Sequence, residues 1–301
     1  MDRNHLDLAV ELRHALPAHP ELSNQEEWTR AELMRFLRAH TKLAVIDRGG
    51  WFYAVYRAPN PKRRIAFRAD HDALPIEDAC DVPYASKIPG VGHKCGHDGH
   101  SAALAAFAME IDKEGCSNDI YFDFQPAEET GDGAVKCAPL ITEEKIDEVF
   151  AFHNWPGYPL GTVCIWYGAV NCASRGMTIR MVGTPSHASM PECGKNPAFA
   201  LATMVNEVPA LLDLPWKGLV LSTVIGLKVG EKAFGTQASE GVLYLTIRAE
   251  REAELDMLAE KTEAMAEREA ARYGLAWHVS YCDCFPETAN EKRFGYFSPS
   301  A

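Results

Sequence analysis

Long apolar runs are absent from this chain, and so is any excess of positive charge. No uninterrupted apolar stretch approaches the roughly 20 residues that a membrane-spanning helix needs. The 30 Lys and Arg residues are outnumbered by 42 Asp and Glu residues, which gives a formal net charge of -12. This balance argues against nucleic acid or an anionic membrane as the main partner. Residues 1–8 are polar and acidic and lack the apolar core of a secretion signal, so we expect a cytoplasmic protein.

The chain also lacks the even set of cysteines that a disulfide framework needs. It has nine cysteines in 301 residues, which is not the pattern of a small, disulfide-stapled secreted domain. We expect most of these thiols to be free and to behave as small, semi-buried apolar residues. Cys282 and Cys284 follow an alternating segment, and we interpret them as thiols at the end of a strand. Cys95 is the exception, because of its neighbours.

The order of predicted elements indicates two domains, which 301 residues accommodate comfortably. In the first part, strands repeatedly lead into polar loops and then into helices, a pattern typical of an α/β sheet with its site at the carboxyl ends of the strands. We expect Asn24 to act as the N-cap of the second helix. The predicted elements are helices over 4–40, broken at Pro17 and Pro20, and 101–110, and strands over 51–56, 65–67, 119–124 and 149–153.

The pattern changes near residue 174. Strands are predicted over 175–182, 219–229, 242–250 and 275–282, and helices over 196–212 and 252–272. The order βαββαβ is that of the ferredoxin-like fold. We therefore predict an α+β domain over 174–283 that is inserted into an α/β domain formed by 1–173 and 284–301.

The segment His-Lys-Cys-Gly-His-Asp-Gly-His at 93–100 carries the strongest chemical signal. Cys95 and His97 are two residues apart across a turn that Gly96 makes possible, so their side chains can converge on one point. Thiolate and imidazole are ligands that Zn²⁺ and similar divalent ions prefer. A lone Cys-x-His would be weak evidence, but two further clusters follow downstream.

The first of these clusters ends in Glu128 and Glu129, directly after a predicted strand. On an extended segment adjacent side chains point to opposite sides, so one carboxylate could bind a metal while the other faces the substrate. Metal-assisted hydrolysis needs both a ligand and a carboxylate that moves a proton from water to the leaving group. Taken alone, a Glu-Glu pair is more often a solvent-exposed acidic turn. The upstream Cys95 and His97 favour a metal-binding or catalytic role for this Glu pair.

His153 ends the next predicted strand, and the Cys95-x-His97 motif together with the Glu pair favours a ligand there over a merely structural histidine. His93 and His100 flank the Cys-x-His motif. His100 could be a third ligand or could hydrogen-bond locally. We rank His93 and His100 below His97 as candidate ligands. Three carboxylates could accept a hydrogen bond from a ligating imidazole and so orient it. They are Asp70, Asp72 and Asp98.

Together these motifs resemble the M20 metallopeptidase family, and most closely its amidohydrolase branch, which cleaves N-acyl amino acids such as hippurate, N-acetyl amino acids or auxin conjugates. The resemblance runs in order from about residue 5 to residue 290. Four motifs in register carry it: Phe67-Arg-Ala-Asp-His-Asp-Ala-Leu-Pro75, His93-Lys-Cys-Gly-His-Asp-Gly-His100, Gln125-Pro-Ala-Glu-Glu-Thr130 and Ser186-His-Ala-Ser-Met-Pro191.

The resemblance implies a zinc-exopeptidase-like catalytic domain with a mixed sheet, an inserted lid and two divalent ions, Zn, Mn or Co. It implies that Cys95 bridges the ions, that His97, Glu129 and His153 complete the visible ligands, and that Glu128 is the general base. It further implies that His187 in the lid polarises the scissile carbonyl, in dimeric members at the partner's site. The implied substrate is a small N-acyl amino acid or peptide, and the implied assembly is a homodimer formed through the lid.

Three departures from the family pattern modify these expectations. His71 stands where the branch usually has an apolar residue, one place off the wider family's ligand position, and is not taken as a ligand. Residues 235–241 replace the usual Asn-Val-Ile-Pro of the lid, so substrate contacts there could differ. The family continues to a final histidine ligand, whereas no histidine follows His278 here. We therefore expect the catalytic domain to be truncated at its C-terminal side.

This last departure leaves two other readings beside an active metal-dependent amidohydrolase. One is a catalytically impaired, metal-binding homologue that holds fewer ions. The other is a protein of a different class, which binds an amino acid or peptide in the same cleft without turnover. Only the binding protein could dispense with Glu128.

Overall fold

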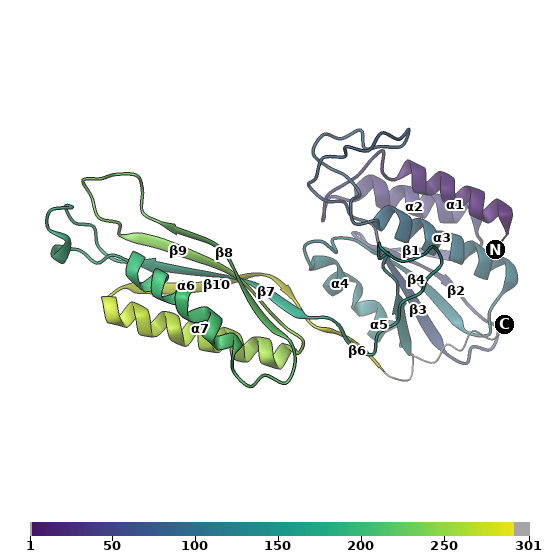
Figure 1. Cartoon of the computed structure of the whole chain (residues 1–301). Helices are drawn as coiled ribbons and strands as arrows, with labels where there is room; N and C mark the ends of the chain where they lie inside the picture. The colour runs from purple at the N-terminus through teal and green to yellow at the C-terminus, as the bar shows by residue number, and fades with distance from the viewer. Residues whose placement is uncertain (1, 292–301) are drawn as a thin grey trace. The chain divides into compact units, whose positions relative to one another are not determined.

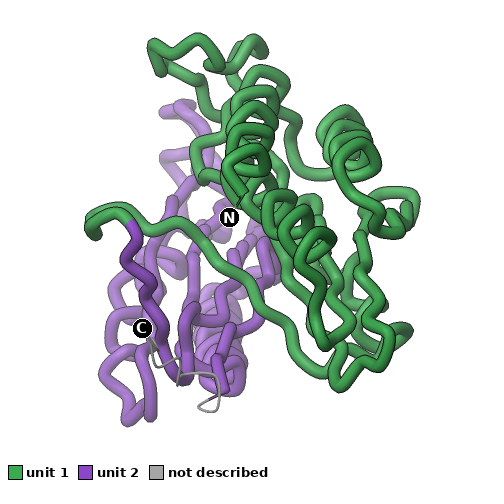
Figure 2. Tube along the Cα trace, turned by 90° about the vertical axis from the view of Figure 1, so that its right-hand side faces the viewer, with its two compact units in different colours: residues 1–160 green, residues 161–301 purple. Residues whose placement is uncertain are grey.

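The computed structural model of the chain describes residues 2–291 (Figure 1). The described residues divide into two compact units, residues up to 160 and residues from 161 onward, which Figure 2 colours separately. No helix among these residues is long and apolar enough to cross a membrane. All nine cysteines are free thiols.

The first unit is built on a five-stranded mixed sheet with the strand order β1-β2-β4-β3-β5. β3 runs parallel to both β4 and β5, while β1, β2 and β4 pair in antiparallel fashion. Every residue of the central strand β4 is buried. The strands are β1 (Ala44–Asp47), β2 (Phe52–Tyr56), β3 (Arg64–Asp70), β4 (Asp119–Gln125) and β5 (Glu148–Ala151).

Helices cover both faces of this sheet. α1 (Arg3–Ala15), α2 (Glu27–His40) and α3 (His97–Glu114) bury their apolar sides against one face, in a core that includes Phe52, Phe122 and Phe124. The short helices α4 (Asp132–Cys137) and α5 (Pro139–Glu143) pack on the other face, where Cys137 and Leu140 join Tyr53 and Tyr121. The predicted α/β class is confirmed, although β1, α4 and α5 were not foreseen.

Two helix starts differ from the sequence prediction. α2 begins after Glu26 rather than at Asn24, whose φ of 67° is left-handed. The carboxylate of Glu21 instead accepts hydrogen bonds from the first free N–H groups, those of Trp28 and Thr29, at 3.0 and 2.8 Å. α3 begins at His97, so the second half of the 93–100 motif forms the first turn of the helix itself.

The second unit contains a four-stranded antiparallel sheet with the order β10-β7-β9-β8. Its strands are β7 (Ala173–Val182), β8 (Val220–Val229), β9 (Glu240–Ala249) and β10 (Ala276–Phe285). Helices α6 (Ala198–Leu212) and α7 (Glu252–Tyr273) bury one face of this sheet, in a core that includes Met177, Leu245 and Leu258. The ferredoxin-like order predicted from the sequence is confirmed.

Smaller elements complete the second unit. The 3-10 helix η1 (Pro191–Cys193) lies in the loop before α6. β6 (Gly168–Asn171) pairs with β11 (Thr288–Asn290) in a separate two-stranded sheet. Of the segment 284–301 that we assign to the catalytic domain, residues 292–301 lie outside the described part of the chain.

Candidate metal centre and active site

The site forms where three strands end at one edge of the first unit's sheet. β3 ends at Asp70, its parallel neighbour β4 ends at Gln125, and β5 ends at Ala151. Since parallel strands present their carboxyl ends at the same edge, the segments that follow them are brought together. These segments carry the Asp70-His-Asp72 motif, the Glu128–Glu129 pair and His153.

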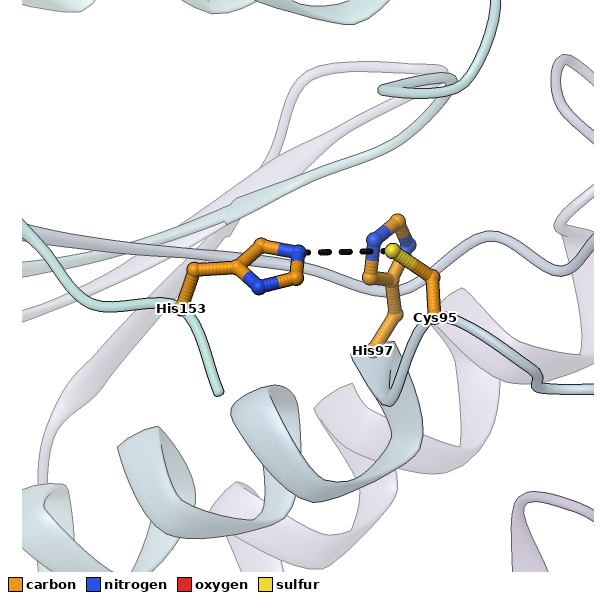
Figure 3. Close-up of side chains that lie close together, drawn as sticks. All are labelled: Cys95, His97 and His153. Carbon is orange, nitrogen blue, oxygen red and sulfur yellow. Dashed lines mark hydrogen bonds between the residues drawn. The ribbon is translucent and has the colours of Figure 1, made fainter. Parts of the chain in front are cut away.

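Cys95, His97 and His153 converge across this edge, as Figure 3 shows. The Sγ atom of Cys95 lies 3.3 Å from Nε2 of His153. The three residues offer ligand atoms that all lie within 4.8 Å of one another. The turn between Cys95 and His97 depends on Gly96, whose φ of 94° is a left-handed conformation that other residues rarely adopt.

His97 is fully buried and its ring is oriented by Asp72. Its Nδ1 lies 3.0 Å from a carboxylate oxygen of Asp72 and 3.0 Å from the Asp72 carbonyl oxygen. Because both are acceptors, Nδ1 donates, and in the neutral ring Nε2 is left free to bind a metal. Asp72 is itself held by Ser23 Oγ and by the N–H of Glu129, at 2.7 and 3.0 Å.

The Nε2 atom of His97 is buried without a hydrogen-bond partner. Carboxylate oxygens surround it: Asp70 Oδ2 at 3.7 Å, Glu128 Oε2 at 3.8 Å and Glu129 Oε1 at 3.7 Å. These distances are too long for hydrogen bonds, and Glu129 Oε1 also lacks a partner. A buried imidazole nitrogen that faces several carboxylates at this spacing leaves room for a cation between them.

The Glu128–Glu129 pair is placed differently from the sequence expectation. We expected an extended segment with the two side chains on opposite sides, but residues 128–130 form a turn and both carboxylates approach His97. The turn is set by Ala127, which has a φ of 47° and donates its N–H to the buried Glu26 carboxylate at 2.6 Å. The sequence offered no signal for Glu26, which lies far upstream.

Burial and neighbouring charges shift the pKa values of four side chains in the site. Burial raises the pKa values of Glu128 and Glu129, and the positive charge of His97 opposes the rise. Burial raises the pKa of Cys95 to about 12, and the neighbouring Glu129 carboxylate adds to the effect. Burial works against charge on His97, but its hydrogen bond to Asp72 and the nearby carboxylates outweigh this and raise its pKa. These four side chains therefore bind their protons more tightly than they would in water.

The donor set fits a divalent metal ion. It combines a thiol, imidazoles and carboxylates within ligand distance of one another, and two of its buried ligand atoms have no protein partner. Besides Cys95-His97-His153, two further groups converge in the same way: Asp70-His97-His100 and His97-Glu128-Glu129. All three groups contain His97, so they describe one continuous centre.

The carboxylates expected to orient the ligands have different partners. Asp72 holds His97, as described, while Asp70 lies 2.6 Å from His100 Nδ1. Asp98 pairs with Arg13 Nε of α1 at 3.1 Å, which ties the start of α3 to that helix. Asp70 is also paired with Arg68 at 2.6 Å. The role of Asp98 toward a ligating imidazole stays a prediction.

His71 is buried and His93 is half-buried beside this cluster, and the buried ring nitrogens of both have no hydrogen-bond partner. Burial lowers the pKa of His71 to about 4 and also lowers that of His93, so both rings are neutral at physiological pH. Neither belongs to a group of converging ligands among the described residues.

His187 lies in an exposed loop of the second unit. It pairs with Thr236 through an isolated bridge, and its Nδ1 lies 2.7 Å from Ser189 Oγ. The neighbouring Ala188 donates its N–H to the Gly235 carbonyl at 3.0 Å. The loop that carries His187 is thus fastened to the segment that departs from the family pattern, and the role of His187 stays a prediction.

Comparison with known proteins shows the family of the chain. The model of the family described as "Peptidase family M20/M25/M40" matches residues 66–285. YhaA of Bacillus subtilis (strain 168) is 34% identical over 292 residues, which cover 93% of this chain and 72% of YhaA. The N-acetyl-L-cysteine deacetylase of the same organism is 28% identical over 291 residues, which cover 94% of this chain and 69% of the deacetylase.

A solved structure is similar as well. The YXEP protein of Bacillus subtilis, described as a dinuclear metal binding peptidase from the M20 family, superposes with a TM-score of 0.82 at 25% identity, over 97% of this chain and 77% of YXEP. The chain belongs to peptidase family M20/M25/M40, in its amidohydrolase branch, and is a hydrolase.

Proposed function

We propose that this protein is a metal-dependent amidohydrolase that cleaves the amide bond of N-acyl amino acids or small peptides. The observation that carries the proposal is the buried Nε2 of His97, which has no protein partner and faces three carboxylate oxygens at 3.7–3.8 Å. The deacetylase relative acts, by its name, on an N-acetylated amino acid, which supports the substrate class.

Cys95, His97, Glu129 and His153 would hold the metal ions. Two divalent ions, Zn, Mn or Co, would supply Lewis-acid polarisation of the amide carbonyl and of the attacking water. Glu128 would accept a proton from that water and deliver it to the leaving amine nitrogen. Its exposure suits this role, since 37% of its side chain is accessible against 22% for Glu129.

We assign different roles to the two predicted domains. We place the metal-binding chemistry in residues 1–173 with 284–301, and we assign a lid and dimerisation role to residues 174–283, with His187 polarising the scissile carbonyl. We place the protein in the cytoplasm, where its nine free thiols would stay reduced.

The test compares Glu128→Gln with Glu129→Gln. Purified chains would be loaded with Zn²⁺, Mn²⁺ or Co²⁺ and assayed for amine release from a panel of N-acyl amino acids. Glu128→Gln should keep its metal and lose turnover by roughly 10²–10⁴-fold, because the amide cannot accept a proton. Glu129→Gln should lose metal, as measured by elemental analysis after gel filtration.

The other outcomes discriminate between the alternatives. Loss of metal in Glu128→Gln and its retention in Glu129→Gln would show that the two roles are reversed. Metal binding without amine release from any substrate in the wild-type chain would favour the impaired homologue. Ligand binding that is unaffected by Glu128→Gln, again without turnover, would favour the binding protein.

A further inference from the structure

Asn154 contacts the candidate metal centre through both its main chain and its side chain. Its carbonyl oxygen lies 2.8 Å from Nδ1 of His153. A carbonyl can only accept, so Nδ1 donates, and in the neutral ring Nε2 is left as the free ligand atom that faces Cys95. Asn154 thus sets which nitrogen of His153 is presented to the centre.

The side chain and N–H of Asn154 are both held by His100. Nε2 of His100 lies 2.7 Å from the amide Oδ1 and 3.0 Å from the main-chain nitrogen of Asn154. The N–H can donate only to an unprotonated Nε2, whereas Oδ1 can accept only from a protonated one. One of the two contacts therefore holds Asn154 in either protonation state of the ring.

The side chain of His100 is itself held in place by burial and by a hydrogen bond. It is 2% exposed, and its Nδ1 lies 2.6 Å from Oδ1 of Asp70, the last residue of β3. The other Asp70 oxygen accepts from Arg68 Nη1 at 2.6 Å, and Arg68 Nε donates to Gln125 Oε1 at 2.8 Å. Asn154 is therefore anchored through His100 to the ends of β3 and β4.

Asn154 also packs directly on the turn that separates Cys95 from His97. A Cβ atom added at Gly96 would lie 2.8 Å from Asn154 Oδ1 and 3.0 Å from its Cγ. The exposed segment after β5 is thus seated against the Cys95–His97 turn by a side chain that fills the space above Gly96.

From these contacts we propose that Asn154 is a positioning residue, which clamps the His153 segment onto the Cys95–His97 turn and so presets the approach of thiol and imidazole. The inference rests on the proposed metal-dependent function, but the clamp is a property of the metal-free chain. Without the side chain of Asn154, the contact between Asn154 and His100 is reduced to the main-chain hydrogen bond, and both His153 and Cys95 become less restrained.

The first test needs no metal. The metal-free wild-type chain and Asn154→Ala would be treated with iodoacetamide for increasing times, quenched and digested with trypsin. Cleavage after Lys94 and Lys113 yields a peptide over 95–113 in which Cys95 is the only cysteine. We expect Cys95 to be alkylated several-fold faster in Asn154→Ala. Cys116, in the adjoining peptide over 114–136, serves as the internal reference and should react at an unchanged rate.

The second test measures zinc affinity by competition with a chromophoric chelator. Loss of a residue that orients a metal ligand typically weakens metal binding by roughly 10–100-fold. We expect that range for Asn154→Ala and wild-type affinity for the control Asn206→Ala, an exposed asparagine on α6. Asn154→Leu keeps the volume but deletes the polar atoms, and it replaces Asn154→Ala if that variant does not fold.

The two tests separate the two hypotheses. Unchanged alkylation of Cys95 in a folded Asn154 variant would overturn the positioning role, as would faster alkylation of Cys95 and Cys116 alike. If the wild-type chain binds no zinc, the proposed function fails, while a selective change at Cys95 would still support the clamp.

Discussion

At the scale of single residues, we expect Cys95 to be the metal ligand that the proposed centre can least replace. It is the thiol that faces both His153 and the carboxylate turn, and in the metal-free chain burial raises its pKa to about 12. A cation would remove this proton and bind the thiolate. We expect Cys95→Ala to lose most of its bound metal by elemental analysis after gel filtration. Cys193→Ala, an exposed thiol in η1, is the matched control, and unchanged metal content in Cys95→Ala would refute the assignment.

Asp123 is a second residue whose effect can be measured, through the pH dependence of the free energy of unfolding. It lies on β4, where burial raises its pKa to about 7 although Cys137 and Arg68 oppose the rise. Its ordinary pKa of 3.8 applies in the unfolded chain. Between these two values the native state binds the proton more tightly, so the contribution of Asp123 to the free energy of unfolding falls as pH rises from 3.8 to 7 and then stays level.

We therefore expect Asp123→Asn to flatten this part of the pH profile. At 1.36 kcal/mol per pKa unit, the shift corresponds to at most about 4 kcal/mol between pH 4 and pH 7. Urea unfolding of wild type, Asp123→Asn and the exposed control Asp81→Asn at several pH values would measure it. Identical slopes in all three proteins would contradict the buried, proton-binding state of Asp123.

At the scale of elements, α4 packs closely against the main chain just after β4, directly before the Glu128–Glu129 turn. A Cβ atom added at Gly133 would lie 1.6 Å from the carbonyl oxygen of Pro126, which is main chain and cannot swing away. We expect Gly133→Ala to lower the free energy of unfolding by about 1–3 kcal/mol, as overpacked sites do. It should also weaken metal binding, because the turn must move.

A second glycine provides the control for this prediction. Gly99 lies in α3 and has no atom within 4 Å of its added Cβ. Gly99→Ala should therefore gain about 0.5–1 kcal/mol from the lower entropy of the unfolded chain. Urea unfolding would measure both variants, and equal effects at the two glycines would show that α4 does not press on the turn.

At the scale of the whole molecule, we predict a homodimer formed through the second unit. β8 is an edge strand of its sheet, and it exposes 42% of Leu221, 63% of Ile225 and 43% of Leu227. An exposed apolar edge is a pairing surface, and a charge on it blocks pairing. Light scattering should give the mass of two chains for wild type and of one chain for Ile225→Lys. Leu160→Lys, on an exposed residue of the first unit, should stay dimeric, and a monomeric wild type at micromolar concentration would disprove the pairing.

The sequence by itself determined the family, the α/β class and the βαββαβ order, and it predicted Cys95, His97, Glu129 and His153 as metal ligands. These follow from local information, because strand and helix periodicity, the glycine turn at Gly96 and the motif at 93–100 each depend on residues that are neighbours in the chain. It did not reveal that the turn at Glu128 and Glu129 brings both carboxylates to the same side.

Only the tertiary structure decided how distant residues hold these ligands. Glu26 accepts a hydrogen bond from Ala127, more than a hundred residues further along the chain, and so fixes the turn there. The side chain of Asn154 contacts His100, which belongs to the 93–100 motif. Such contacts connect segments that are far apart in the sequence, so no local or periodic sequence pattern predicts them. They arise because buried polar groups must find partners once strand pairing has brought the ends of β3, β4 and β5 to one edge.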